Sequence, residues 1–287
     1  MATNTAGPAL GARSLFVETM ISPDQNQVPV HGIVKRNAVH DVLDERIEEL
    51  QIVGYTVIES GFNDATLDGF RTRLAEVNEQ QEECEGAGQA NDAFIVRCPL
   101  ASDDMFLSVA TCPPLMEVCR RILGENFVLL QQNGVINRPN SRDYQSRWHR
   151  DLSYQHFVTS RKIALNALLC LDDFTLETGG TVVLPATHSQ ENFPSDSYVR
   201  AHETVAVARA GLFLVMDAML FHRSGNNVSA NSRSGINHLI GLPFFSQQLD
   251  IPRMLKRDMS GDPFLKRYLG YQWNPAEDVH SWRSKRS

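Results

Sequence analysis

A histidine and an aspartate separated by one residue form the sharpest chemical pattern in the chain, within Trp148-His149-Arg150-Asp151. On a β-strand, side chains at positions i and i+2 point to the same face, so His149 and Asp151 can reach one metal ion together. They would supply two of the three ligands of a two-histidine, one-carboxylate iron site, which leaves positions open for a bidentate cosubstrate and O₂. The pair alone is weak evidence, because a polar pair on a surface strand has the same spacing.

A second histidine far along the chain completes the set of candidate ligands. His222 ends the apolar run Met219-Leu220-Phe221 and is followed by Arg223-Ser224-Gly225-Asn226. A lone histidine at the end of an apolar strand is more often structural than metal-bound. His222 therefore needs support from the residues around it.

That support comes from Arg233, eleven residues after His222. A guanidinium grips a carboxylate through two parallel hydrogen bonds and stays charged at any working pH. 2-Oxoglutarate chelates a metal through its keto-acid end, and its distal carboxylate needs such a partner. Ser224 shares a face with His222 if the strand continues, so its hydroxyl can donate to the same carboxylate. The competing interpretation of Arg233 is a solvated surface arginine.

The elements that must position these residues begin with a largely helical first half. Apolar residues at helical spacing predict helices over 39–53, about 63–80, 113–123 and, in the C-terminal part, near 252–258. Pro113 or Pro114 marks the start of the third helix, and Gly124 follows its end. Residues 54–58 form a short β-rich run, and the polar residues 81–93 are predicted to be a surface loop.

From Phe127 onward, short runs rich in Val, Leu and Ile alternate with turn residues. These runs predict strands near 127–137, 146–151, 162–172, 180–185, 204–208, 212–216, 219–224 and 233–243. Such strands behind a helical front are typical of a β-sandwich or barrel with helices packed outside. Linker signals are weak, so we expect one domain over 39–287, with its β core at about 127–245 and a helical C-terminal tail. Residues 1–38 are expected to form an N-terminal arm.

Composition narrows the class of protein. The chain has 287 residues and a formal net charge of −7, which disfavours nucleic acid or an anionic membrane as a partner. No apolar run approaches the roughly 20 residues that span a bilayer, and the N-terminus lacks the layout of a secretory signal. We therefore expect a cytoplasmic protein. The five cysteines are odd in number and form no C-x-x-C pair, so we expect free thiols rather than disulfides or a thiolate zinc site.

Several motifs together resemble the phytanoyl-CoA dioxygenase family of Fe(II)/2-oxoglutarate oxygenases, which includes ectoine hydroxylase. The similarity runs from about Glu48 to Phe245. The matching segments are Leu50 to Ile58 (LQIVGYTVI), Leu123-Gly124, Trp148 to Asp151, Gly179-Gly180-Thr181 through His188, and His222 to Asn226 followed by Arg233.

The resemblance implies a mainly β fold with flanking helices and a double-stranded β-helix (jelly-roll, cupin-like) core, which binds one Fe(II) and 2-oxoglutarate and uses O₂. It implies His149, Asp151 and His222 as metal ligands, with Arg233 and Ser224 at the distal carboxylate. It also favours Asn137 as a residue near 2-oxoglutarate. The residue pattern agrees, because Gln131, Asn133, Val135 and Asn137 alternate along one strand face that is unusually polar. A solvent-facing polar row is the alternative.

One departure from the family pattern is Pro185-Ala186-Thr187-His188 in place of P-G-S-H, which affects nothing catalytic; His188 is not expected to be a ligand. The carboxylate of Asp151 is retained, whereas related halogenases replace it with a small residue. The resemblance therefore implies hydroxylation, or a related oxidation such as desaturation, of an unactivated C–H in a small molecule. By analogy we expect a role in specialised-metabolite biosynthesis, with acyl-CoA or amino-acid hydroxylation in primary catabolism as the alternative.

Other classes of function stay open at this point. A zinc-dependent hydrolase would use the same three ligands but would not need Arg233 and Ser224. A non-catalytic jelly-roll binding protein would keep the fold without turnover. Residues expected to cover the site, with Asn133 as a further substrate contact, include the 85–97 loop, Tyr154 and Phe157, residues 188–203, and Tyr268, Tyr271 and Trp273 of the tail. The sequence leaves open the oligomeric state, with a homodimer among the options.

Overall fold

The computed structural model describes residues 28–85, 95–141, 144–259 and 261–284. The chain divides into two compact units, Met1–Ala38 and Val39–Ser287. In the first unit, the described residues 28–38 are exposed and include neither helix nor strand. The helices and strands that the structure describes all belong to the second unit.

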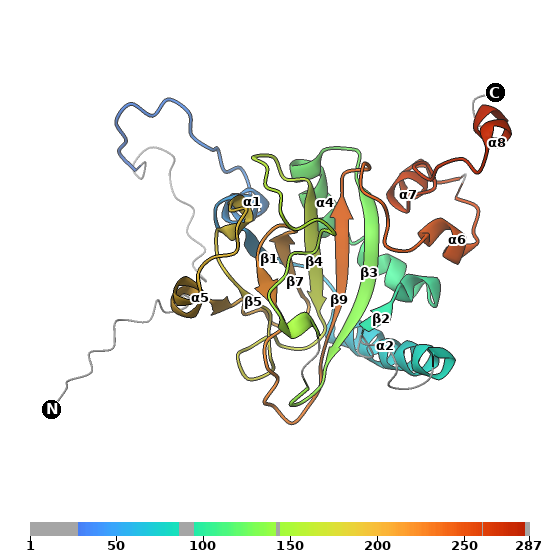
Figure 1. Ribbon diagram of the computed structural model, residues 1–287, viewed down its shortest axis with the longest axis horizontal. Helices are drawn as coiled ribbons and strands as arrows, with labels where there is room; N and C mark the ends of the chain where they lie inside the picture. Colours follow the sequence, from blue (N-terminus) through green and yellow to red (C-terminus); the bar gives the residue numbers. More distant parts are fainter. Residues whose placement is uncertain (1–27, 86–94, 142–143, 260, 285–287) are drawn as a thin grey trace. The chain divides into compact units, whose positions relative to one another are not determined.

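A six-stranded antiparallel sheet forms the centre of the second unit (Figure 1). Its strands, in spatial order, are β1 (Tyr55–Glu59), β7 (Leu212–Asp217), β4 (Ala164–Cys170), β9 (Arg233–Gly241), β3 (Val128–Asn137) and β2 (Ile95–Arg97). Strands far apart in the sequence are thus neighbours, and β9 lies between β4 and β3. Arg233 is therefore the first residue of a strand in the interior of the sheet, with a neighbouring strand on either side.

A smaller sheet of three short strands faces the first one. It consists of β6 (Thr204–Val205), β5 (Val182–Val183) and β8 (His222–Arg223). Buried residues of both sheets pack together between them, including Leu168 and Leu214 of the large sheet and Val183 of the small one. Two antiparallel sheets enclosing such a core make the jelly roll that the family resemblance implies.

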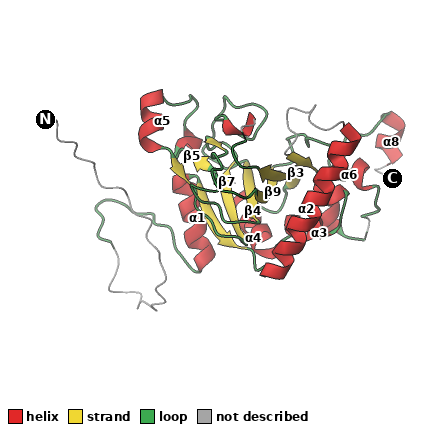
Figure 2. Cartoon of the chain, turned by 90° about the horizontal axis from the view of Figure 1, so that it is seen from below, coloured by secondary structure: helices red, strands yellow, loops and turns green. Residues whose placement is uncertain are grey.

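Helices cover the opposite face of the large sheet. They are α1 (Val42–Val53), α2 (Asp64–Glu85), α3 (Met105–Ala110) and α4 (Pro113–Leu123), and Figure 2 shows them along one side of the strands. Because side chains alternate along a strand, Leu165, Ala167 and Leu169 of β4 join this outer core while Leu168 points to the other side. The inner face of the large sheet therefore lines the interior of the jelly roll.

The remaining helices are short. They are α5 (Asp196–His202), α6 (Ile251–Leu255), α7 (Pro263–Tyr268) and α8 (Val279–Ser284), with 3₁₀ turns at Pro99–Ala101, Tyr144–Ser146 and Thr187–Ser189. Tyr268 is fully buried and its hydroxyl donates to the carbonyl of Ala110 at 2.7 Å, so it belongs to the core and not to a cover over the site. None of the described helices is long and apolar enough to cross a membrane.

Local signals explain the best predictions. Helix α1 begins after Asp41, whose side chain accepts from the amide of Asp44, and ends at Gly54, which has a φ of 94°. Helix α4 spans 113–123 as predicted. The prediction of a loop over 81–93 is wrong for residues 81–85, which continue α2, while 86–94 lie outside the described residues.

The predicted strand over 146–151 is a second error. Residues 144–146 form a 3₁₀ turn, and the segment after them makes only one isolated bridge, at His149. Residues 218–220 of the partner segment form a turn, closed by the amide of Leu220 donating to the carbonyl of Asp217, so no regular ladder forms there. Strands near 180–185, 204–208 and 219–224 exist, but each is only two residues long.

Candidate metal centre

The H-x-D segment lies directly against the segment that carries His222. The amide of His149 donates to the carbonyl of His222 at 3.0 Å, and the amide of His222 donates back to the carbonyl of His149 at 3.1 Å. The amide of Asp151 donates to the carbonyl of Ala218 at 3.1 Å. This pairing places the three side chains together although 146–151 is not a regular strand.

The three side chains converge on one point. Asp151 Oδ1 lies 3.7 Å from His149 Nε2 and 3.5 Å from His222 Nε2. One candidate ligand atom from each residue lies within 4.8 Å of the others, and no other such group of histidine, cysteine, aspartate or glutamate is found in the described part of the chain. Two imidazole nitrogens and one carboxylate oxygen are the donor set of a facial iron site.

Both imidazoles are oriented by the backbone two residues before them. His149 Nδ1 lies 2.8 Å from the carbonyl of Arg147, and His222 Nδ1 lies 2.9 Å from the carbonyl of Leu220. A carbonyl can only accept, so each Nδ1 carries the proton and each Nε2 presents its lone pair to the common point. This is the arrangement that protein metal sites use to fix the histidine tautomer.

The carboxylate of Asp151 is oriented by Asn166, whose Nδ2 donates to Asp151 Oδ2. The other oxygen, Oδ1, is thus the one that faces the histidines. Burial by itself raises the pKa of Asp151, but the charge and hydrogen bonding of His222 outweigh it, so this pKa lies below its ordinary value. Burial likewise opposes the charged form of His222, and Asp151 raises its pKa overall. Asp151 is therefore an ionised carboxylate, as a metal ligand must be.

A cavity adjoins the three ligand atoms and contains the predicted carboxylate clamp, which is Arg233 together with Ser224. Arg233 and Ser224 line it, together with the polar side chains of Gln145, Asn166, Thr181, Arg223 and Asn237 and the apolar ones of Val135, Leu168 and Met216. Arg233 is only 2% exposed. Its Cζ lies 4.1 Å from the centre of the Phe174 ring, and its Nη2 donates to Ser224 Oγ at 3.3 Å. Arginine and serine are therefore close enough to bind the same carboxylate.

A close backbone approach holds this clamp in position. The Nη2 group of Arg233 donates to the carbonyl of Gly179 at 2.7 Å. A Cβ at Gly179, which has a φ of 70°, would lie 2.7 Å from both Asn137 Nδ2 and the amide of Asn227, so only glycine fits. Asn137 Nδ2 also lies 3.0 Å from the carbonyl of Gly225 and 3.2 Å from Ser224 Oγ.

The polar row predicted on β3 lies on the inner face, but its members differ in place. Asn137 pairs with Arg233, Asn133 with Asn237 and Gln131 with Leu239 in one continuous register, which ends at a β-bulge between Gln131 and Leu129. Asn137 therefore supports the clamp. Gln131 and Asn133 line a separate small gap beside Gln248, not the metal cavity.

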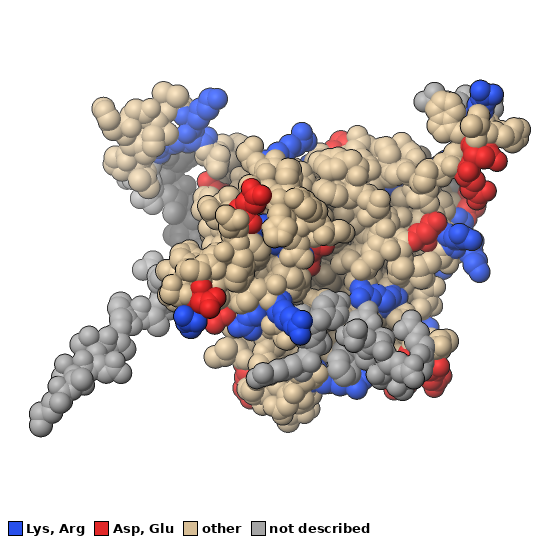
Figure 3. Space-filling model, in the orientation of Figure 1, with Lys and Arg blue, Asp and Glu red and all other residues tan. Residues whose placement is uncertain are grey.

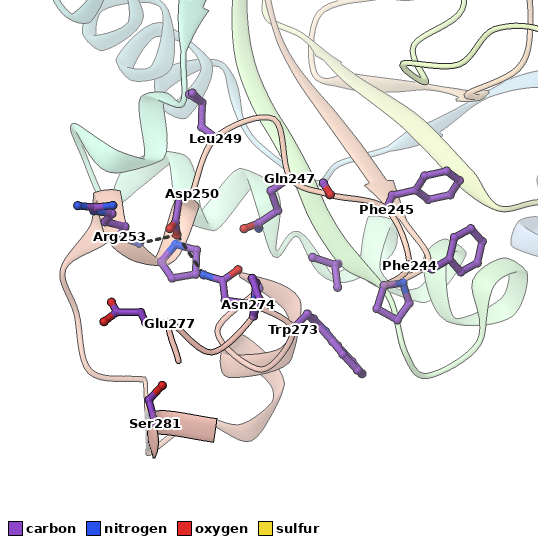
Figure 4. A pocket seen from close by; sticks show the side chains of 16 residues that line it. Phe244, Phe245, Gln247, Leu249, Asp250, Arg253, Trp273, Asn274, Glu277 and Ser281 are labelled. Atoms are coloured by element: carbon purple, nitrogen blue, oxygen red, sulfur yellow. Dashed lines mark hydrogen bonds between the residues drawn. The ribbon is translucent and has the colours of Figure 1, made fainter. Parts of the chain in front are cut away.

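The two aromatic residues predicted to contact substrate are on the surface. Tyr154 is 67% exposed and Phe157 46% exposed, and neither lines the cavity. Trp273 of the tail lines a different cavity of about 830 Å³, between the segment after β9 and the C-terminal helices (Figure 4). That cavity contains none of the candidate ligands. Size alone does not identify the site.

Sequence reasoning missed three residues at the centre. Arg150, between the two ligands of the H-x-D segment, is 2% exposed and points away from the metal site to donate to backbone carbonyls. Asn166 interrupts an otherwise apolar, fully buried strand, and this was the available signal. Asn237 occupies a comparable position on β9 and also lines the cavity.

Figure 3 shows how charged side chains lie on one face of the protein. On the face shown in Figure 3, lysine and arginine side chains are interspersed with aspartate and glutamate, without one continuous basic surface. That the protein has no nucleic-acid partner stays a prediction.

Comparison with known proteins shows relatives over most of the chain. The phytanoyl-CoA dioxygenase (PhyH) family matches residues 50–235. An uncharacterized protein of Mycobacterium bovis is 29% identical over 223 residues, which cover 74% of this chain and 80% of that protein. The dioxygenase olcK of Penicillium canescens is 28% identical over 195 residues, covering 64% of this chain and 63% of that protein.

Solved structures share the fold. EctD from S. alaskensis with bound Fe superimposes with a TM-score of 0.60 at 17% identity, covering 72% of this chain and 80% of EctD. HygX from Streptomyces hygroscopicus with nickel and 2-oxoglutarate bound gives a TM-score of 0.54 at 16% identity, covering 72% and 90%. The family match spans more than half of the sequence and includes His149, His222 and Arg233. The chain therefore belongs to the phytanoyl-CoA dioxygenase family.

Proposed function

We propose that this protein is a non-haem Fe(II)- and 2-oxoglutarate-dependent dioxygenase that oxidises an unactivated C–H of a small molecule. One observation carries the proposal: the Nε2 atoms of His149 and His222 and Oδ1 of Asp151 converge beside a cavity that also contains the buried Arg233. The metal ligands and the partner for a distal carboxylate thus adjoin one space. Proteins named dioxygenase among the relatives, and neighbours with bound iron or 2-oxoglutarate, support the same conclusion.

The donor set fits a bound metal. His149, Asp151 and His222 would hold Fe(II), and Arg233 with Ser224 would bind the distal carboxylate of 2-oxoglutarate. When bound, Fe(II) with 2-oxoglutarate and O₂ supplies the oxidant for a C–H bond and releases succinate and CO₂. Asn166 keeps one oxygen of Asp151 directed at the metal position, and Asn137 fixes the loop that carries Ser224. The apolar side chains of Leu168 and Met216 limit water around the reacting centre.

The retained carboxylate of Asp151 favours hydroxylation or desaturation over halogenation, because it leaves no room for chloride beside the metal. We place the reaction in specialised-metabolite biosynthesis, since the dioxygenase relatives are fungal and the structural neighbours include enzymes such as SnoN "from nogalamycin biosynthesis". Acyl-CoA or amino-acid hydroxylation in primary catabolism is the alternative setting.

A zinc-dependent hydrolase is the competing reaction class for the same ligands. It has no use for a buried arginine directed at a second carboxylate. Hydrolysis without any need for 2-oxoglutarate would favour it over the oxygenase.

Succinate formation tests the proposal directly. Wild-type protein supplied with Fe(II), ascorbate and O₂ should convert 2-oxoglutarate to succinate slowly without substrate, and Asp151→Ala should abolish this conversion. Asp196→Ala, at an exposed position of α5, is the matched control and should keep it. Near wild-type turnover by Asp151→Ala would contradict the ligand assignment.

A further inference from the structure

Two asparagine side chains in the cavity each have an oxygen atom that binding of the metal and 2-oxoglutarate alone does not explain. Asn166 lies on β4 and Asn237 on the neighbouring β9. In the register of these strands Asn237 faces Leu168, two residues from Asn166, so the asparagines are diagonal neighbours on the inner face. Such neighbours are about 7–8 Å apart, and one small molecule can contact both.

Each of these asparagines presents a hydrogen-bond acceptor that lacks a donor. Oδ1 of Asn166 and Oδ1 of Asn237 are buried and have no hydrogen-bond partner among the described residues. The orientation of Asn166 is fixed, because its Nδ2 donates to Asp151 Oδ2. The opposite orientation would place the amide oxygen against an ionised carboxylate. Its Oδ1 is therefore an acceptor by necessity.

The cosubstrates cannot supply the missing donors. Ionised 2-oxoglutarate has two carboxylates and a keto group, all acceptors, and O₂ has no hydrogen. A buried acceptor without a donor is rare and unfavourable. The donors therefore come from water or from a further ligand in the same cavity, and a ligand that displaces the water has to supply them itself.

We propose that the substrate is a small polar molecule whose hydroxyl or amino groups donate to Asn166 Oδ1 and Asn237 Oδ1. This inference rests on the proposed function and narrows its substrate class. Leu168 and Met216, on the same face, offer an apolar surface to the carbon skeleton. An unsubstituted alkyl or acyl chain would leave both amide oxygens unpaired, so the site disfavours fatty acyl groups.

Ligand-observed NMR on protein loaded with Zn(II) and 2-oxoglutarate tests this without turnover. The probes are the 1,2-, 1,3- and 1,4-cyclohexanediols and aminocyclohexanols, compared with the dimethyl ethers of the diols, which keep the ring but have no donor. We expect at least one donor-bearing ring to bind about tenfold more tightly than its ether, and Asn237→Leu to weaken that binding about tenfold. Asn237→Asp, which keeps an acceptor, should retain it.

The control is Asn231→Leu, the same substitution at an exposed asparagine, which should change nothing. Equal binding of diols and ethers, no binding of any donor-bearing ring, or an unaffected Asn237→Leu would each overturn the substrate inference. Metal-dependent binding of 2-oxoglutarate, measured in the same samples, reports on the proposed function separately. If that binding persists while the diols behave like the ethers, only the substrate class is wrong.

Discussion

Replacing Arg150 with lysine should lower both the stability of the protein and the metal affinity of the site, although the side chain contacts no ligand atom. Its guanidinium donates through Nε to the carbonyl of Met219 at 2.7 Å and through Nη1 to those of Gln155 at 2.6 Å and Glu191 at 3.2 Å. Through Nη2 it donates to the carbonyls of Thr187 and Gln190. The Arg150 guanidinium thus connects the H-x-D segment by hydrogen bonds to the backbone that precedes His222 and to the turn after β5.

The expected magnitude follows from the number of donors. Lysine has three N–H groups against the five of arginine, so at least two of the five carbonyls lose their partner. At about 1–3 kcal/mol for each buried group left unpaired, the substitution costs about 4 kcal/mol of unfolding free energy. For a domain of this size that lowers the melting temperature by about 10 °C. The guanidinium also stacks 3.8 Å from the centre of the Phe221 ring, a contact that lysine keeps only in part.

Two measurements check this prediction. Thermal unfolding of the metal-free protein gives the stability change, and a competition titration gives the metal affinity, which should fall about 10–100-fold because both ligand segments lose support. Arg147→Lys is the matched control, since Arg147 is a neighbouring exposed arginine whose side chain should not matter. A melting temperature within about 2 °C of wild type, together with unchanged metal affinity, would refute the reasoning.

Three further substitutions probe separate parts of the site and core. Arg233→Lys should raise the apparent KM for 2-oxoglutarate about tenfold or more, because the two-point contact is lost, while metal affinity stays near wild type; an unchanged KM removes Arg233 from its role. Asn166→Leu should weaken metal binding about 10–100-fold by freeing Asp151, and equal affinity in a competition titration would speak against this. Burial lowers the pKa of His238 from 6.5 to about 4. The unfolded chain therefore binds a proton that the native protein does not, and about 3 kcal/mol of stability present above pH 6.5 is lost as the pH falls to 4. His238→Gln should remove that part of the pH dependence, and an identical stability profile from pH 7 to 4 would show that His238 is not its source.

The sequence predicts elements best where local chemistry decides them. Helix α4 has proline at its start and Gly124 after its end, and both signals act within the helix itself. Strand β9 is nine residues long, and its prediction at 233–243 from the sequence overlaps it fully. Short strands such as β5 and β8 exist only because distant segments pair with them, so their bounds cannot be read locally.

The candidate site shows the same difference between features that local sequence decides and features that depend on distant segments. The prediction that His149 and Asp151 converge assumes a continuous strand, yet their convergence depends on backbone pairing with His222 and Ala218. Arg150 gave no sequence signal of its role, because its five acceptors are main-chain carbonyls that any residue carries. The sequence predicts Tyr268 over the site, but the centre of its ring lies 5.7 Å from that of Phe127 in the core. Tertiary packing decides such cases.

Anaerobic absorption spectroscopy tests the central claim most directly. Fe(II) and 2-oxoglutarate added to wild-type protein without O₂ should give a visible charge-transfer band that requires all three components, and His222→Ala should not give it. The account is contradicted if wild-type protein gives no band at saturating Fe(II) and 2-oxoglutarate, or if the band forms equally well in His222→Ala.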